Sequence, residues 1–146
     1  MGQDRQSFHA WGSPVGDYRK LRAWKKAHEL AILVYRATES FPSTERYGLV
    51  SQMRRAATSA ASNLVEGVGR NRNAETARFV RIALGSCTEL EYQVLLSKDL
   101  KFLERDLALK LTERTIELRA MLASLHRRLL PGPTEPGRPK TRYSDS

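Results

Sequence analysis

The sequence predicts an all-α protein, an antiparallel up-down-up-down four-helix bundle flanked by disordered N- and C-terminal tails. Apolar residues recur with helical spacing over four successive segments, and short stretches containing Gly, Pro or Asn separate these segments. No stretch alternates apolar and polar residues in the manner of a half-buried strand. We therefore expect a flexible arm over residues 1–17, the bundle over 18–130, and a disordered basic Pro/Gly-rich tail over 131–146.

The first helix is predicted over residues 18–39. Its broad apolar face includes Leu21, Trp24, Ala27 and His28, and we interpret His28 as a hydrogen-bonded core histidine. Phe41-Pro42 ends this helix, because the residue before a proline is disfavoured in helical conformation. Ser43 is then the candidate N-cap of the next helix.

The second helix is predicted over residues 44–68, and small side chains dominate its apolar arc. Leu49, Met53, Ala56, Ala57, Ala60, Ala61 and Leu64 fall on this arc. Alanine at these positions lets a neighbouring helix approach to the short end of the usual ~8 to 10 Å interaxial range. The glycines of Glu66-Gly67-Val68-Gly69 are expected to supply a left-handed cap.

Polar residues line the flank of the second helix. A carboxylate, a guanidinium and hydroxyl groups on one stripe are costly to bury unless they bond to one another. One interpretation is a structural polar network at a helix interface, and the alternative is a solvated face with unrelated charges. The expected members are Arg55, Ser59, Asn63, Glu66 and, from the third helix, Glu89.

The third helix is predicted from Asn73, as its cap, to about residue 98, with Cys87 and Leu95 among its inward-facing residues. The fourth begins near residue 105 and repeats leucine at seven-residue spacing, as a bundle seam does. This series is Leu111, Leu118 and Leu125.

Three helices also carry apolar residues away from the predicted core face. Such secondary stripes would form exposed patches that monomers rarely tolerate, so they predict self-association. The expected oligomer interface comprises Leu30, Leu33, Ile82, Tyr92, Leu96 and Ile116.

Net charge is +9 and the isoelectric point is near 10.1. The positive charge belongs to the first, second and fourth helical segments, whereas residues 73–100 are slightly negative and the tails contribute little. A fixed positive surface attracts polyanions through counterion release, although charge can also serve solubility alone. The candidate nucleic-acid-binding residues are Arg19, Arg22, Lys26, Arg70, Arg72, Arg127 and Arg128. No motif for base-specific readout accompanies them.

Sites for other chemistry are not evident. His9, His28 and His126 have no metal-ligand spacing with each other or with Cys87, so we expect no metal and no cofactor. Paired acid and base groups with a nucleophile are also missing, so we expect no catalytic residues and no enzyme. The lack of a long apolar run and of a signal-peptide pattern predicts a cytoplasmic protein without membrane contact.

Several short motifs resemble a family of four-helix-bundle proteins encoded within intervening sequences of bacterial large-subunit ribosomal RNA genes. They are Leu21-x-x-Trp24, Phe41-Pro42, Tyr47-Gly48-Leu49, the Arg54–Ala57 run, Asn63–Gly67, Phe79 and Gly85–Leu90. A related branch comprises the accessory variability determinants of diversity-generating retroelements, which work beside a reverse transcriptase. The resemblance implies a homopentameric ring with a positively charged surface and no catalytic residues.

These inferences leave two function classes open. One is a non-enzymatic basic oligomer that binds RNA, DNA or a nucleoprotein partner, with a reverse-transcriptase accessory role as its sharper form. The other is a structural or protein-interaction oligomer without nucleic-acid binding. A hydrolytic enzyme has little support.

Overall fold

A computed structural model of the chain describes residues 17–132. Within this range all regular secondary structure is helical, which confirms the predicted all-α class. The α-helices are α1 (Arg22–Thr38), α2 (Leu49–Val68), α3 (Asn73–Asp99) and α4 (Arg105–Leu129). Two short 3-10 helices, η1 (Tyr18–Lys20) and η2 (Ser43–Glu45), precede α1 and α2. The expectations for the arm and the tail concern residues 1–16 and 133–146, which lie outside the described residues.

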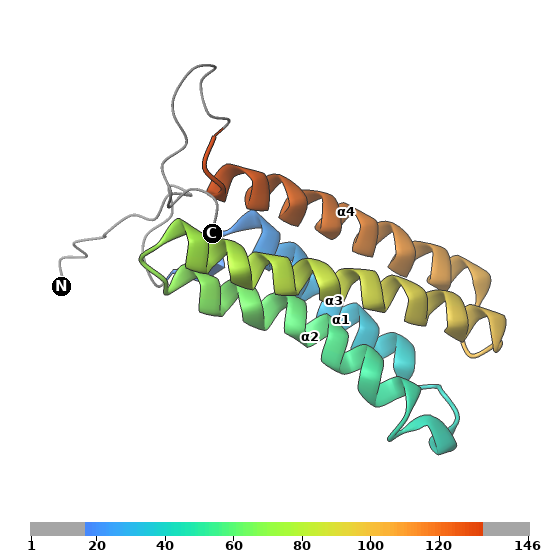
Figure 1. The fold of residues 1–146 in the computed structure, drawn as a ribbon. Helices are drawn as coiled ribbons and strands as arrows, with labels where there is room; N and C mark the ends of the chain where they lie inside the picture. Colours follow the sequence, from blue (N-terminus) through green and yellow to red (C-terminus); the bar gives the residue numbers. More distant parts are fainter. Residues whose placement is uncertain (1–16, 133–146) are drawn as a thin grey trace, which may run out of the picture.

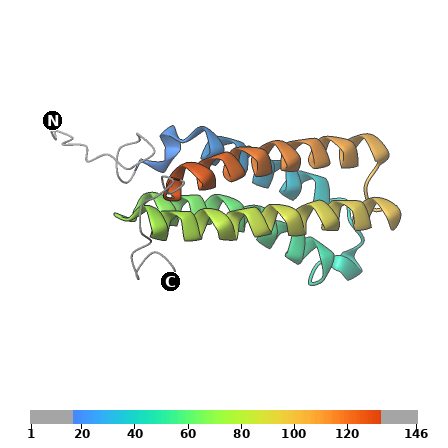
Figure 2. The ribbon, with the colours of Figure 1, turned by 45° about the horizontal axis from the view of Figure 1, so that its top comes forward.

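The four helices pack side by side in an antiparallel up-down-up-down bundle (Figure 1). Each helix contacts the next along the chain, and α4 returns to contact α1. Figure 2 shows the long α3 and α4 running together along the full length of the bundle. This topology brings the start of α1, the end of α2, the start of α3 and the end of α4 to one end of the molecule.

The core runs along the bundle axis as one continuous cluster. Leu111, Leu118 and Leu125 of α4 are all buried in it, so the seven-residue leucine series is a bundle seam as predicted. The largest fully buried side chains of the cluster are Met53, Leu64, Leu90, Leu111, Leu118 and Leu122. Burial of these apolar surfaces is the main stabilising term of the fold.

Small residues bring α2 close to its neighbours. Ala57 and Ala60 are 0% and 1% exposed, as the alanine-rich arc predicted. At the end of α2, a Cβ on Gly67 would lie 3.3 Å from Cβ of Phe79. Thr76 Oγ1 donates a hydrogen bond to the Gly67 carbonyl at 3.1 Å. Gly67 therefore serves the close α2–α3 contact.

The predicted helix starts and caps need correction at four places. The N-cap of α3 is Arg72, and Asn73 is its first helical residue. Leu21 has an extended backbone, so α1 begins at residue 22 and not at 18. Ser43 starts η2, and the N-cap of α2 is Gly48, with Glu45 Oε2 accepting from the Leu49 amide at 3.2 Å. Gly69 has φ −75°, so the predicted left-handed cap is wrong.

Two residues assigned to the core from periodicity are exposed. His28, expected as a core histidine, is exposed and stacks on Trp24 with ring centroids 5.0 Å apart. Leu95 is 48% exposed. Both lie at the edges of broad apolar arcs, where a small error in the assumed helix phase moves a side chain out of the core.

Candidate nucleic-acid interface

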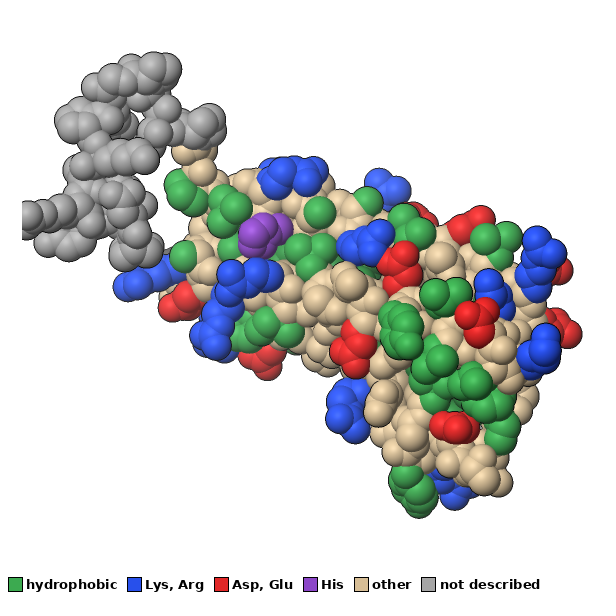
Figure 3. Space-filling view, turned by 45° about the vertical axis from the view of Figure 1, so that its right-hand side comes forward, with side chains coloured by type: hydrophobic (Ala, Val, Ile, Leu, Met, Phe, Trp, Pro, Cys, Tyr) green, Lys and Arg blue, Asp and Glu red, His purple; other side chains and the backbone are tan. Residues whose placement is uncertain are grey.

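One end of the bundle is rich in arginine. We call it the basic pole and define it by nine residues from η1, α1, α3, α4 and the α2–α3 connection. They are Arg19, Arg22, Lys26, Arg70, Arg72, Arg78, Arg81, Arg127 and Arg128. The carboxylates at or beside this end, Asp17, Glu29, Glu66, Glu75 and Glu117, are fewer than these cations. In Figure 3, most acidic side chains on the visible face lie in the right-hand half of the molecule.

Cations from helices far apart in sequence meet at this pole. Arg22 of α1 and Arg128 of α4 line one hollow of about 450 Å³, whose remaining lining comes from Leu21 and from the same two helices. Arg127 is the exposed neighbour of Arg128 in the last turn of α4. Cations at a helix C-terminus are favoured by the helix dipole, so this pair has a local stabilising role besides its contribution to the surface field.

A second hollow lies where α2 connects to α3. Arg70 and Arg72 line a depression of about 300 Å³ together with Asn71 and Glu75. The guanidinium of Arg70 lies over the ring of Phe79, 4.8 Å from its centroid. No side chain caps the start of α3. The first amides of a helix lack intrahelical partners and carry partial positive charge, so they add to the attraction that two arginines exert on an anion.

Several pole residues already have acidic partners, all of them at the surface. Lys26 pairs with Glu117 at 3.2 Å, Arg19 with Asp17 at 3.7 Å and Arg70 with Glu66 at 3.5 Å. Within residues 17–132 the other arginines of the pole form no ion pair, and they are exposed. They are Arg22, Arg72, Arg78, Arg81, Arg127 and Arg128. These six are free to exchange water for phosphate.

Arg78 and Arg81 were not among the candidates predicted from sequence. The antiparallel topology places this first half of α3 at the basic pole, while Glu89, Glu91 and Asp99 lie further along the helix. The net charge of the whole of α3 is slightly negative, so it hid the positive charge of the first half of the helix. The net charge of each half, together with the predicted antiparallel topology, would have pointed to both arginines.

The predicted polar network between α2 and α3 forms only in part. Asn63 Nδ2 donates to the Ser59 carbonyl and hydroxyl at 2.8 and 3.0 Å, and Ser86 Oγ donates to Ser59 Oγ at 2.8 Å. The Ser86–Ser59 hydrogen bond therefore links the two helices, and Asn63 holds Ser59 from within α2. Ser86 was missed because a lone serine between apolar residues gives little signal.

The charged members expected in this network are engaged elsewhere. Arg55 is exposed and donates to Ser51 at 3.5 Å, Glu66 pairs with Arg70, and Glu89 accepts from Gln93 at 3.1 Å. Arg55 forms no ion pair with either glutamate among the described residues. The prediction was wrong for these three, because their side chains reach solvent and need no buried partner.

Comparison with known proteins identifies the fold independently of these contacts. The family model described as 23S rRNA-intervening sequence protein matches residues 19–124, which is most of the chain. The chain belongs to this family. The matched residues begin within η1 and extend over most of α4, and they end before Arg127 and Arg128.

A solved structure has a similar fold. It is the 1.70 Å crystal structure of a protein of unknown function from the S23 ribosomal protein family of Bacteroides thetaiotaomicron. The two chains are 20% identical and superpose with a TM-score of 0.66, covering 72% of this chain and 98% of the other. At this identity the likeness concerns the fold alone. No curated protein matches this chain significantly in sequence.

The expected oligomer-interface residues of this 23S rRNA-intervening sequence protein fall into three groups. Leu30 is only 2% exposed and belongs to the protomer core, so its assignment to an outer stripe was wrong. Leu33 and Leu96 are half-buried against that core. Ile82, Tyr92 and Ile116 are exposed. Leu95 and Leu109 join the exposed apolar residues of α3 and α4.

The single cysteine of the family member is enclosed by the core. Cys87 is buried, and burial raises the pKa of its thiol from 9.0 to about 12. We expect native protein to react far more slowly with a thiol reagent than protein unfolded in denaturant. Equal rates would contradict this burial.

The same pKa shift predicts a pH dependence of stability. Between about pH 9 and pH 12 the unfolded chain releases the Cys87 proton while the folded chain keeps it, so the free energy of unfolding falls as pH rises. Urea denaturation at pH 8 and pH 10 measures this fall. It should be smaller in Cys87→Ala than in the parent, and an unchanged pH dependence would contradict the assignment.

Neither a membrane-spanning helix nor a metal site is found among the described residues. No helix within residues 17–132 has both the length and the hydropathy needed to cross a membrane. Among the same residues, no group of three or more His, Cys, Asp and Glu side chains is placed to hold a metal ion.

Proposed function

We propose that this family member is a non-enzymatic, cytoplasmic homo-oligomer whose basic pole binds the phosphate backbone of RNA or DNA. The observation that carries this proposal is the convergence, at one end of the bundle, of exposed arginines that form no ion pair within residues 17–132. They come from α1, α3, α4 and the α2–α3 connection. Phosphate contacts of this kind give affinity without sequence preference, and they weaken as salt rises.

Self-association would strengthen the attraction for phosphates, because the positive charge of several basic poles would be brought together. Exposed apolar side chains on α3 and α4 support self-association: Tyr92 is 61% exposed, Leu109 56% and Ile116 42%. Tyr92, Leu95 and Leu109 line a groove of about 670 Å³ between these helices. A closed ring of like subunits, most simply the pentamer that the sequence resemblance implies, would place one basic pole from every subunit on the same side.

Introducing a charge into this surface should dissociate the oligomer. We expect Ile116→Glu or Tyr92→Glu to shift the molar mass measured by light scattering toward the monomer, because a carboxylate cannot be buried there without a partner. The helical circular dichroism should persist, since both side chains lie outside the protomer core. Ser62→Glu, which places the same charge on the exposed face of α2, is the matched control. A parent protein that is monomeric at micromolar concentration would remove the oligomer from the proposal.

Binding itself is tested by retardation of duplex DNA and structured RNA of unrelated sequences at low salt. We expect both to be retarded with similar affinity. If neither is retarded at micromolar protein concentration, the phosphate-binding function fails.

A second candidate is a structural or protein-interaction oligomer. The apolar groove between α3 and α4 favours it, because such a groove can also receive a helix of another protein.

In its sharper form the first proposal makes the protein an accessory to a reverse transcriptase, where nucleic acid and enzyme would be bound together. Co-purification with an enzyme encoded beside the gene tests that form.

A further inference from the structure

We propose that an aromatic row along α1 stacks the unpaired bases of single-stranded nucleic acid. The row consists of Tyr18, Trp24, His28 and Tyr35 and is called the α1 aromatic row below. This inference rests on the proposed function and specifies the kind of nucleic acid bound. The basic pole would hold the phosphates, while the row would hold the bases.

Ring geometry at the start of the row supports a stacking surface. The rings of Trp24 and His28 are stacked, with centroids 5.0 Å apart and an angle of 8° between their planes. Tyr18 meets Trp24 edge-on, with centroids 5.0 Å apart and an angle of 65°. Trp24 is half-buried against the core, which fixes its orientation, whereas His28 is exposed. The stack is therefore anchored on one side and open to solvent on the other.

Helical geometry continues the row toward α2. At 100° per residue, Trp24, His28 and Tyr35 fall within an arc of about 40°. Tyr35 is 43% exposed, and the guanidinium of Arg54 lies 4.5 Å from its ring centroid. Arg54 also donates to Thr38 Oγ1 at 3.0 Å and to the Tyr35 carbonyl at 3.2 Å. A fixed guanidinium plane on an aromatic ring is itself a surface on which a base can stack.

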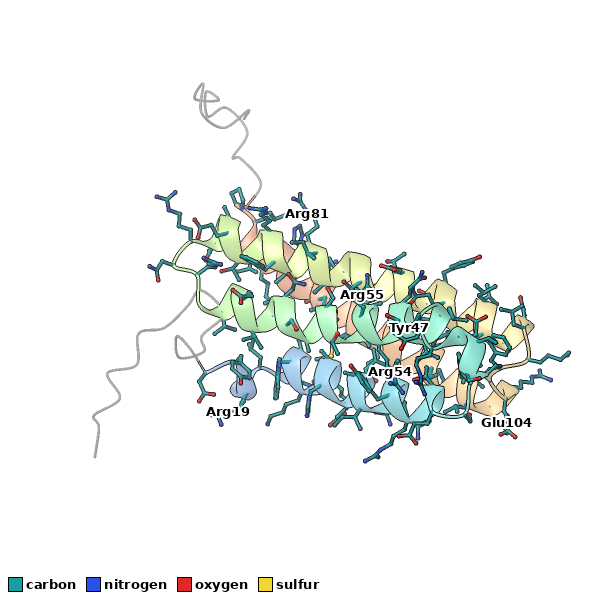
Figure 4. The ribbon with its side chains drawn as sticks, turned by 90° about the horizontal axis from the view of Figure 1, so that it is seen from below. Arg19, Tyr47, Arg54, Arg55, Arg81 and Glu104 are labelled. Carbon is teal, nitrogen blue, oxygen red and sulfur yellow. The ribbon has the colours of Figure 1, made fainter. Side chains whose placement is uncertain are left out.

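Cations accompany the row at both ends. Arg19 and Arg22 belong to the basic pole, Lys25 and Arg36 are exposed along α1, and Arg54 closes the far end. Figure 4 shows Arg19 beside the start of α1 and Arg54 beside its C-terminal half. Within α1 alone, Trp24 and Tyr35 are separated along the axis by roughly 16 Å at 1.5 Å per residue, which accommodates several nucleotides. The row leads from the basic pole along one flank of the bundle.

This arrangement distinguishes single strands from duplexes. In a duplex the faces of the bases are covered by neighbouring base pairs, so no base face is open for stacking on the row. In a single strand each base offers an open face, and aromatic side chains with nearby cations bind such strands with little sequence preference. We therefore expect tighter binding to single strands than to a duplex of equal length.

The test compares two oligonucleotides with the same number of phosphates, oligo-thymidine and its abasic analogue. The protein carries Trp11→Phe, so that Trp24 is the only tryptophan in the chain. We expect oligo-thymidine to bind at least about fivefold more tightly than the abasic strand and to quench Trp24 fluorescence. His28→Ala and Tyr35→Leu change exposed side chains and should reduce this preference. Tyr47→Leu, an exposed tyrosine between η2 and α2, is the matched control and should leave it unchanged.

The outcomes separate this inference from the proposed function. Equal affinity for the two strands, or an unchanged preference in both His28→Ala and Tyr35→Leu, would overturn base stacking while phosphate binding stands. If neither strand nor a duplex binds at low salt, phosphate binding fails as well. Thermal melting of each variant shows whether its fold is retained, and loss of preference in folded His28→Ala supports the inference.

Discussion

Leucine in place of Ala57 or Ala60 will lower the melting temperature of the protein by several degrees. Both alanines are fully buried on the α2 face that packs into the core. Added methylene groups in a well-packed core force neighbours off their preferred rotamers and typically cost about 1 to 3 kcal/mol. For a domain of this size, each kcal/mol corresponds to roughly 2 to 8 °C. Thermal unfolding followed by circular dichroism measures the effect.

Ala74→Leu provides the matched control. Ala74 is exposed in the first turn of α3, so the same added side chain meets solvent there and should leave the melting temperature nearly unchanged. If Ala57→Leu and Ala60→Leu both melt with the control, the alanine-rich arc of α2 does not face a tightly packed helix. The close approach at Gly67 would then also lose its explanation.

The fold could be predicted because the main periodic features of the sequence agreed with it. Leu111, Leu118 and Leu125 recur at bundle spacing, and Ala57 and Ala60 are small where α2 packs closely. The arginine, serine and glycine motifs pointed to the family, and that assignment is confirmed. Helix boundaries were less certain, because Leu21 and Gly48 interrupt helices through backbone conformations that side-chain periodicity does not report.

The candidate site was harder to predict, because a surface depends on which helices are neighbours. Leu30 was assigned to an outer stripe, but its position on α1 lies within the wide buried face of this helix. His28 was placed in the core and is exposed. Arg78 and Arg81 were overlooked because the acidic second half of α3 offsets their charge. Each of these errors concerns the orientation or pairing of helices and not their existence.

Exchange of Arg72, Arg127 and Arg128 for glutamine should reduce affinity for unrelated duplexes and RNAs about equally, by at least about tenfold at low salt. These arginines are exposed and form no ion pair within the described residues, so their removal costs the fold only the helix-dipole interaction of Arg127 and Arg128. Each phosphate contact that is lost removes a counterion-release contribution, and an oligomer loses it once per subunit. Filter binding or mobility shift with two unrelated sequences measures the change.

The control for this triple variant removes the same charge from the opposite end of the bundle. Arg46, Lys101 and Lys110 are exposed and also lack ion pairs within residues 17–132. Their exchange for glutamine should change affinity much less, because any residual effect reflects only the lower net charge. Equal losses in the two triple variants would mean that the charge acts as a diffuse field and that the basic pole is no distinct binding surface.

The salt dependence of binding tests the central claim most directly. For the parent protein, the logarithm of the binding constant should fall linearly with the logarithm of salt concentration, with a slope set by the number of phosphates neutralised. In the Arg72, Arg127 and Arg128 variant the slope should flatten by about one for each phosphate contact that is lost, while the control variant keeps the parent slope. A parent affinity that does not vary with salt, or a pole variant that retains the full slope, would contradict phosphate binding by the basic pole.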